Sequence, residues 1–280
     1  IAMAATLFSS LFNVVFDYVL MFPLGLSMSG AALATALSPI IGVLICCIHF
    51  KSEKCSISFK PVGLSIKKLI YSCQVGVSAF VGEISSGVIT VAFNMIILGL
   101  AGNIGVAAYG VVANISLVAV ALFNGIAQGS QPLVSECYGK GRMKDVRYVV
   151  GLAFKTALVL AVLIIAAIYI WSDPIASIFN SEKNPELAAY AREGIRLYFI
   201  GFLFAGINIV GTSALSAVEA VRWAFTASIM RGFVAILIFA FALSAVFGMT
   251  GVWLAFPAAE LVTMLLSLTG ISKSIWAKCR

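Results

Sequence analysis

One stretch without a charged side chain decides the fold of this protein. Residues 84–135 read ISSGVITVAFNMIILGLAGNIGVAAYGVVANISLVAVALFNGIAQGSQPLVS. An α-helix needs about 20 predominantly apolar residues to cross a bilayer, so this stretch is long enough for two crossings. Over all 280 residues, 62% of the side chains are hydrophobic and 10% are charged. Soluble domains carry about 25% charged residues, so this composition excludes soluble enzymes, nucleic-acid-binding domains and disordered chains.

Glycines, prolines and charge clusters divide the whole chain into apolar segments of membrane-spanning length. The segments cover residues 1–22, 29–49, 67–99, 104–134, 146–171, 191–218, 222–247 and 250–276. We therefore expect an all-α membrane protein with eight transmembrane helices.

The positions of the basic residues predict how these helices are oriented. Fourteen of the 18 Lys and Arg residues lie in segments 50–68 and 135–155, in the loop that holds Arg222, and at the C-terminal end. Cytoplasmic loops carry an excess of Lys and Arg, so we assign this side to the cytoplasm. Arg192 and Arg196 are exceptions, just inside the sixth predicted helix. We expect a multi-pass protein of the cell membrane with a cytoplasmic chain end.

A weak internal repeat suggests how the helices are grouped. Residues 28–34 (MSGAALA) resemble residues 249–255 (MTGVWLA), and each copy lies at a short external turn before a helix that runs inward. Parallel repeats of this kind are a recurrent transporter architecture. We expect residues 1–50 to be the last two helices of an N-terminal lobe, 51–66 a cytoplasmic linker, and 67–280 a complete six-helix C-terminal lobe. Four helices of the first lobe would then precede this sequence.

Polar side chains in the first two predicted helices mark a candidate ion site. Charges within membrane spans are rare and usually face a cavity or a partner. Asn13 and Asp17 are four residues apart and project from one helix face. Thr35 enters from the same external turn and lies at a similar depth on the next helix. A carboxylate, an amide oxygen and a hydroxyl at one level suit Na⁺ or a proton, and a helix–helix hydrogen-bond clamp is the alternative.

Two further polar stripes run along the third and fourth predicted helices. The first stripe contains Glu83, Ser86, Gly87, Thr90 and Asn94, and the second contains Asn114, Asn124, Gln128 and Gln131. Two facing stripes can line a wet substrate cavity, and a structural hydrogen-bond ladder is the alternative. A carboxylate such as Glu83 is costly inside a membrane helix, which favours the cavity.

Arg231 and Glu260 are expected to form a buried ion pair. They lie roughly 13–15 Å into adjacent antiparallel helices, so their depths allow contact. We expect a structural role for this pair, because removal of one partner would leave a buried charge. With one His, no HExxH motif and no Ser–His–Asp set, the sequence lacks the parts of an intramembrane enzyme, and we expect no cofactor.

Several motifs, read together, resemble one family over essentially the whole chain. They are GEISSGV at 82–88, Phe93-Asn94, VAAYG at 106–110, GIAQGSQP at 125–132, and Asn13-x-x-x-Asp17 with SGAALAT at 29–35. This combination resembles the multidrug and toxic-compound extrusion (MATE) family, in particular its prokaryotic branch.

The resemblance implies a twelve-helix antiporter of two six-helix lobes around a central cavity. It implies export of amphiphilic, often cationic drugs or toxic metabolites, driven by inward movement of Na⁺ or H⁺ as the coupling ion. In family members of this type a first-lobe cation site uses residues that match Asn13, Asp17 and Thr35. The first-helix Asp that completes that site has no counterpart here. In another branch the seventh-helix carboxylate sits about one turn later than Glu83 does, which is a departure from that pattern.

Two alternatives to a drug exporter stay open. One is a lipid or polysaccharide-precursor flippase of related architecture, and the other is a non-transporting membrane fragment. A flippase for polyanions needs a basic cavity, but the only deep basic residue is Arg231, against three deep acids. The expected partners are therefore the lipid bilayer and amphiphilic cationic small molecules, with no nucleic acid, and we expect a monomer.

Overall fold

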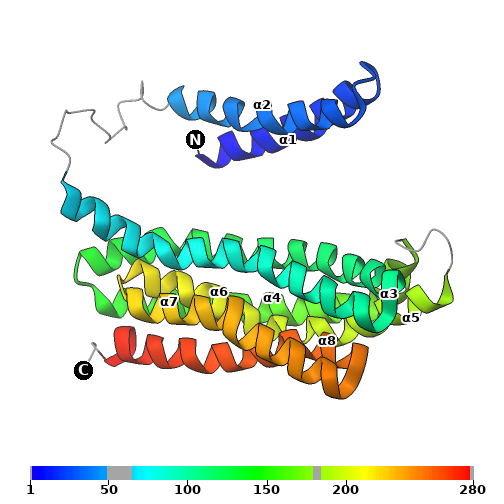
Figure 1. The fold of residues 1–280 in the computed structure, drawn as a ribbon. Coiled ribbons are helices and arrows are strands. Elements are labelled where there is room, and N and C mark those ends of the chain that lie inside the picture. Colours follow the sequence, from blue (N-terminus) through cyan, green and yellow to red (C-terminus); the bar gives the residue numbers. More distant parts are fainter. Residues whose placement is uncertain (1, 49–64, 179–183, 278–280) are drawn as a thin grey trace. The chain divides into compact units, whose positions relative to one another are not determined.

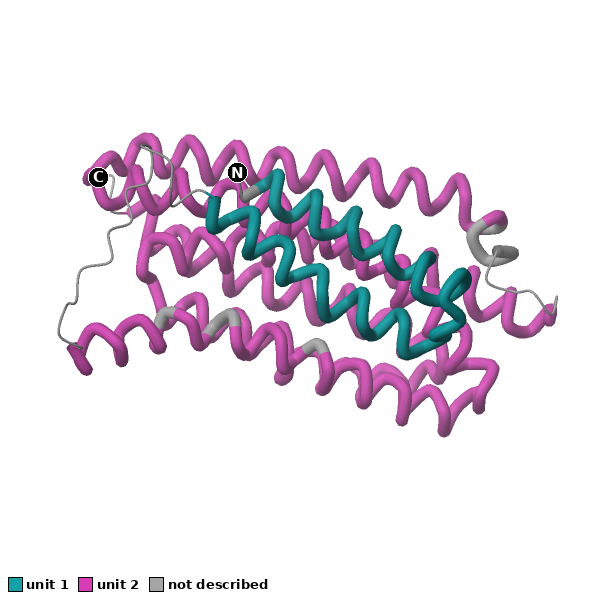
Figure 2. The backbone as a smooth tube through the Cα atoms, turned by 90° about the horizontal axis from the view of Figure 1, so that it is seen from above, with its two compact units in different colours: residues 1–64 teal, residues 65–280 magenta. Residues whose placement is uncertain are grey.

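The computed structural model describes residues 2–48, 65–178 and 184–277, and every regular element within these ranges is a helix. The chain divides into two compact units, residues 1–64 (unit 1) and residues 65–280 (unit 2), which Figure 2 shows in different colours. The linker predicted at 51–66 lies almost entirely outside the described residues.

Unit 1 is a hairpin of two apolar helices, α1 (Ala2–Met21) and α2 (Ser27–Ile48). The turn between them contains Gly25 at φ +65°, a left-handed conformation that favours glycine. A Cβ at Gly30 would lie 2.8 Å from the carbonyl carbon and oxygen of Leu20, so only glycine allows this close approach. Small residues of this kind let membrane helices pack backbone against backbone.

Unit 2 begins with α3 (Ile66–Gly139), which consists of two long legs joined at one glycine. Gly102 has φ +60° and ψ −155°, and Figure 1 shows α3 turning back on itself between its two legs. The rings of Phe93 and Tyr109, one from each leg, stack with their centroids 5.4 Å apart. The next helix, α4 (Met143–Ile178), is interrupted at Trp171.

The segment predicted as one helix at 191–218 forms two helices in the structure. These are α5 (Pro185–Phe199) and α6 (Phe202–Ala217), which are bent by 48° relative to each other. The break coincides with a close contact, because a Cβ at Gly201 would lie 2.5 Å from the ring of Phe256. Gly201 is one of four glycines within the segment 191–218 and has no charge or proline beside it, so the sequence predicted a continuous helix.

The C-terminal part of unit 2 is a second broken helix pair. Its elements are α7 (Val221–Ile229), the π-helical turn η2 (Met230–Val234), α8 (Ala235–Ile271) and the π-helical turn η3 (Ser272–Trp276). The two legs of α8 meet at Gly248, at φ +59° and ψ −133°. A Cβ at Gly251 would lie 1.9 Å from the carbonyl oxygen of Leu243, so the tight turn requires glycine there too.

The helices of the described residues are those of a multi-pass membrane protein. Five of them are long and apolar enough to cross a membrane, or six if α5 and α6 count as one span. Two of the five, Phe80–Gly139 and Val221–Trp276, contain the breaks at Gly102 and Gly248. The all-α membrane class is therefore confirmed. The count of eight requires each leg to be a separate span, and it stays a prediction.

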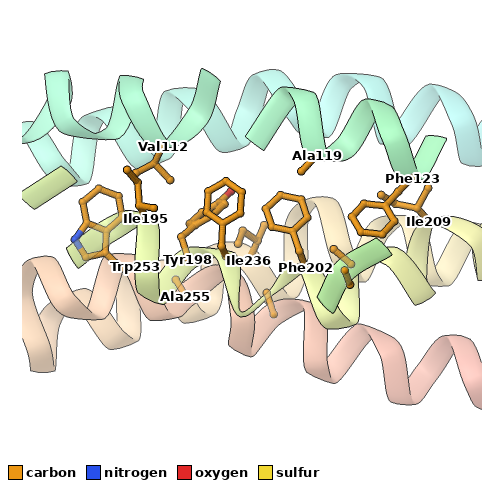
Figure 3. Packing of buried hydrophobic residues seen from close by; sticks show 14 of the residues in the cluster. Val112, Ala119, Phe123, Ile195, Tyr198, Phe202, Ile209, Ile236, Trp253 and Ala255 are labelled. Carbon is orange, nitrogen blue, oxygen red and sulfur yellow. The ribbon is translucent and has the colours of Figure 1, made fainter. Parts of the chain in front are cut away.

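The core of unit 2 is a row of buried rings, shown in Figure 3. Trp253 and Phe123 are completely buried in it, and Tyr198 stacks on Phe256 with the ring centroids 4.2 Å apart. Glycines make room for three of the rings, those of Trp253, Phe256 and Phe123. A Cβ at Gly194 would lie 2.9 Å from the indole of Trp253. Each of these rings packs against a glycine of a neighbouring helix. This close packing fixes how the helices lie against each other.

Candidate functional site

In unit 1 the structure joins two of the three residues predicted for ion binding, and the third lies one helical turn away. Nδ2 of Asn13 donates a long hydrogen bond of 3.5 Å to Oγ1 of Thr35, which joins α1 to α2. Asp17 lies one helical turn after Asn13 on the same face of α1. Its Oδ1 atom is buried and has no hydrogen-bond partner among the described residues.

An unsatisfied carboxylate oxygen is a costly group inside a membrane helix, and a cation or a proton would relieve that cost. For such an ion, Asp17 would supply the charge, and the side-chain oxygens of Asn13 and Thr35 would be the candidate neutral ligands. A purely structural clamp between α1 and α2 already exists elsewhere, because the Ser9 hydroxyl donates to the carbonyl oxygen of Ser38 at 2.6 Å. That hydrogen bond needs no carboxylate, whereas the hydrogen bond between Asn13 and Thr35 also joins α1 to α2.

The two polar stripes of unit 2 lie mostly on its exposed surface. Glu83 and Thr90 are exposed and Asn94 is half-buried, while the side chain of Ser86 lies outside the described part. The second stripe is also exposed, at Asn114, Asn124, Gln128 and Gln131. Asn114 donates to the carbonyl oxygen of Gly110 in its own helix at 2.8 Å. The structure does not join the stripes through Glu83 and Gln128, neither of which hydrogen-bonds to a described residue.

A cavity of about 810 Å³ lies beside the first leg of α3, on a different side from most of the polar stripe. Its lining includes Ile84, Val88, Val91 and Met95 of α3, and Leu237 and Phe241 of α8. Gly87 is the one lining residue that also belongs to the stripe. Because the lining is apolar, this cavity suits the hydrophobic part of a ligand rather than a charged group.

Arg231 and Glu260 form an ion pair in unit 2, with Nε of Arg231 2.6 Å from Oε1 of Glu260. Glu260 is 2% exposed, whereas the side chain of Arg231 is 30% exposed. Sequence reasoning missed a third member of this cluster, Asn208 of α6. Its Nδ2 donates to Oε2 of Glu260 at 2.6 Å and to the backbone oxygen of Glu260 at 2.8 Å. The sequence signal that could have indicated Asn208 is a single amide side chain in the middle of an apolar helix.

Comparisons with curated proteins identify relatives of the chain. The MatE family model matches residues 79–242. The multidrug export protein MepA of Staphylococcus saprophyticus is 27% identical over 272 residues, which cover 96% of this chain and 59% of the relative. MepA of Staphylococcus haemolyticus is 28% identical over 277 residues, with the same two shares. The chain thus spans 59% of the length of these relatives.

Solved structures show the same fold. An outward-facing multidrug resistance MATE family transporter of the MOP superfamily superposes with a TM-score of 0.91 at 19% identity, over 99% of this chain and 63% of that one. The sequence motifs, the family model and the fold agree. Because the MatE model matches more than half of the residues, the resemblance inferred from the motifs is confirmed, and the chain belongs to the MatE family of efflux transporters.

Proposed function

We propose that this protein works in a cation-coupled antiporter that exports amphiphilic, often cationic drugs or toxic metabolites. MATE proteins are transporters rather than enzymes, and the curated relatives are named multidrug export proteins. In this proposal residues 67–280 form the C-terminal six-helix lobe of a twelve-helix transporter. Residues 1–50 are the last two helices of the N-terminal lobe, and residues 51–66 link the lobes on the cytoplasmic side. The two lobes alternate access across the membrane.

We propose the cell membrane as the location, with the chain end in the cytoplasm, and a monomer as the working state. The excess of Lys and Arg in the connections at 50–68 and 135–155 supports this orientation.

The observation that carries the proposal is the unsatisfied Oδ1 of Asp17 beside the pair of Asn13 and Thr35. A Na⁺ ion or a proton that binds there neutralises the carboxylate in one state of the transporter. A ligand shifts a two-state equilibrium only by its difference in affinity for the two states. A change in the ratio of the two conformations from 1:99 to 99:1 requires a difference in binding free energy of about 5.5 kcal/mol. Neutralisation of an unpaired charge in the membrane interior contributes a free energy of this order.

The charges of the membrane segments support cationic substrates. Glu83 is exposed on α3 and hydrogen-bonds to no described residue, so its carboxylate is available to a cationic ligand. Arg231, the deep basic residue, is already paired with Glu260. In the proposal the polar stripe of Glu83 and the neighbouring apolar cavity receive the charged and the hydrophobic parts of a substrate. A flippase for polyanionic lipids would need the opposite distribution of charge.

The test is efflux of a cationic dye from proteoliposomes that contain the full-length protein, under an imposed Na⁺ or H⁺ gradient. The variant Asp17→Asn keeps the shape of the side chain but removes its titratable charge. We expect it to retain dye binding, measured by fluorescence polarisation, and to lose export driven by the gradient. Thr35→Ala should weaken the apparent ion affinity less, because only one neutral oxygen is lost.

The matched control is Ser9→Ala, which removes a hydrogen bond between α1 and α2 without changing a charge. This variant should still couple export to the gradient. Wild-type export by Asp17→Asn under both gradients would exclude the unit 1 site as the coupling site. Loss of coupling in Ser9→Ala as well would mean that the helix pairing, not the ion site, had been disturbed.

A further inference from the structure

Gly87 lies at the border between the polar stripe of α3 and the apolar cavity beside this helix. It belongs to the stripe and also lines the cavity. Successive residues of a helix are rotated by about 100°, so Gly87 lies about 40° around α3 from Glu83 and Val91 lies about 80° from it, in the same direction. No described atom lies within 4 Å of a Cβ placed at Gly87. The missing side chain therefore leaves an open passage from the charged face of α3 to the cavity.

A close contact between α3 and η2 fixes the position of the two cavity walls. A Cβ at Gly232 would overlap Oγ of Ser85, so the two elements touch there through very small groups. The hydroxyl of Ser85 donates to the carbonyl oxygen of Val81 in its own helix. Leu237 of α8, five residues after Gly232, lines the opposite wall. The cavity of about 810 Å³ is therefore already formed without a ligand, and its volume is in the range of pockets for drug-sized molecules.

The cavity lining suits bulky apolar groups of varied shape. Val91 and Met95 of α3 and Phe241 of α8 line the cavity, and each of these side chains is more than half exposed. Methionine is flexible and polarisable and is common at surfaces that bind many different ligands. A phenylalanine ring can stack on a flat aromatic group. This lining therefore favours aromatic groups and imposes little selection on their hydrogen bonding.

Glu83 decides which class of molecule occupies the cavity. Exposed apolar side chains of a membrane protein also contact lipid chains, so the lining by itself fits a lipid as well as a drug. The carboxylate of Glu83 is exposed one helical turn before Gly87, and it has no hydrogen bond or ion pair with a described residue. A carboxylate that faces lipid chains is costly. A cation with an apolar group satisfies both the carboxylate and the cavity, whereas an acyl chain satisfies only the cavity.

We propose that the stripe and the cavity together select cations whose charge lies about 6 Å from a bulky apolar group, and that Gly87 sets the size limit of that group. The helix rises about 6 Å over the four residues from Glu83 to Gly87. The cationic group lies at Glu83, and the apolar group passes Gly87 into the cavity. A small cation gains only the ion pair, and an uncharged apolar compound gains only the cavity. This inference rests on the proposed export function and adds the shape of its substrates.

The test measures binding of trimethylammonium cations that carry a methyl, phenyl, naphthyl or pyrenyl group on a short linker. Each cation displaces a fluorescent cationic dye from the purified full-length protein in nanodiscs. We expect the affinity of the wild type to rise along the series with the apolar area that is buried. Gly87→Leu should lower the affinity for the pyrenyl cation by about tenfold or more and for the smallest cation by less than about twofold, because the new side chain fills the passage and not the ion site.

Gly87→Ala is the milder variant and should lower the affinity for the pyrenyl cation by a smaller factor. Because its Cβ meets no described atom and alanine favours a helix, this variant should fold like the wild type. The matched control is Gly82→Leu. Gly82 is also exposed and open on the same leg of α3, but it lies about 140° around the helix from Gly87. This control should bind the whole series like the wild type.

A second readout locates the apolar group. A brominated naphthyl cation should quench the added tryptophan fluorescence of Phe241→Trp, which lines the cavity. It should not quench that of Phe247→Trp, which replaces an exposed ring of the same leg of α8 outside the lining. Quenching of Phe241→Trp by lipids with brominated acyl chains that the pyrenyl cation does not relieve would show that the cavity holds a lipid chain, and would overturn the inference.

The outcomes separate this inference from the export function on which it rests. Wild-type affinity of both Gly87 variants for the pyrenyl cation would overturn the inference and leave the proposed export function standing. An equal loss of affinity in Gly82→Leu would also overturn it, because the effect would not be specific to the passage. Failure of the wild type to export any of these cations from proteoliposomes would refute the proposed function itself.

Discussion

Arg231 of η2 and Glu260 of α8 are joined in the interior of unit 2 by an ion pair of 2.6 Å. Asn208 of α6 donates to the other carboxylate oxygen, so the carboxylate of Glu260 connects three elements. A buried pair of this kind is often no more stable than a hydrophobic pair of the same size, but loss of one partner leaves a buried charge. The free-energy cost therefore depends on whether one member or both are replaced.

We expect Glu260→Gln and Arg231→Gln each to lower the free energy of unfolding by on the order of 3–5 kcal/mol. The double variant Arg231→Met/Glu260→Met should be less destabilised than the sum of two single changes, because no charge is left without a partner. Thermal unfolding of the purified protein in detergent measures both effects.

The control is the exposed pair of Glu136 and Lys140, four residues apart in unit 2. The variant Glu136→Gln/Lys140→Gln should change the stability by less than about 1 kcal/mol, because water and salt screen exposed pairs. If Glu260→Gln were no more damaging than this control, the pair of Arg231 and Glu260 would not be a buried structural contact.

Gly251→Ala should destabilise the fold strongly, because the new Cβ would overlap the carbonyl oxygen of Leu243 in the turn of α8. Overpacking of this kind typically costs about 1–3 kcal/mol, and backbone atoms relax less easily than side chains. The measurement is the yield of monodisperse protein on size-exclusion chromatography.

The matched change is Gly151→Ala in α4, where no atom lies within 4 Å of the new Cβ. This variant should be neutral or stabilised by up to about 1 kcal/mol, because alanine favours the helix over glycine. Similar yields from Gly151→Ala and Gly251→Ala would contradict the close contact at the turn.

The sequence predicted the helix breaks at Gly102 and Gly248 and missed the break at Gly201, although a glycine lies there too. The predicted limits 99/104 and 247/250 enclose Gly102 and Gly248, the glycines with positive φ in α3 and α8. The break between α5 and α6 lies at Ile200–Gly201, where the contact of Gly201 with Phe256 comes from a residue more than 50 positions away. Such a contact cannot be read from local composition.

In the candidate site, too, local spacing was predictable from the sequence and contacts between distant residues were not. The spacing of Asn13 and Asp17 fixes their common helix face, and the structure adds the contact with Thr35. Asn208 was missed because its role depends on Glu260, 52 residues later in the chain. A periodic sequence pattern shows which face of a helix Glu83 or Gln128 occupies. It does not show which other helix that face contacts, because this depends on tertiary packing.

The predicted orientation is testable by cysteine labelling in intact cells, with a variant that lacks the natural cysteines as the background. Asn103→Cys lies at the exposed turn of α3, and Lys140→Cys lies at the exposed C-terminal end of the same helix. An impermeant maleimide should label position 103 from outside and reach position 140 only after permeabilisation, because the basic end of α3 is assigned to the cytoplasm. Efficient external labelling at position 140 would reverse the assignment.

Glu83→Gln should reduce the export of cationic dyes while leaving the protein folded. Glu83 is exposed and hydrogen-bonds to no described residue, so loss of its charge should change the stability by no more than about 0.5 kcal/mol. A contact with a charged group contributes about 1.5–3 kcal/mol, and its loss should lower export of a cationic dye by on the order of tenfold.

Uncharged substrates should be affected much less, because they gain nothing from the carboxylate. Glu136→Gln, an exposed change near the C-terminal end of the same helix, is the control and should export both kinds of dye normally. Efflux from proteoliposomes measures each rate, and wild-type export of cationic dyes by Glu83→Gln would remove this carboxylate from the substrate path.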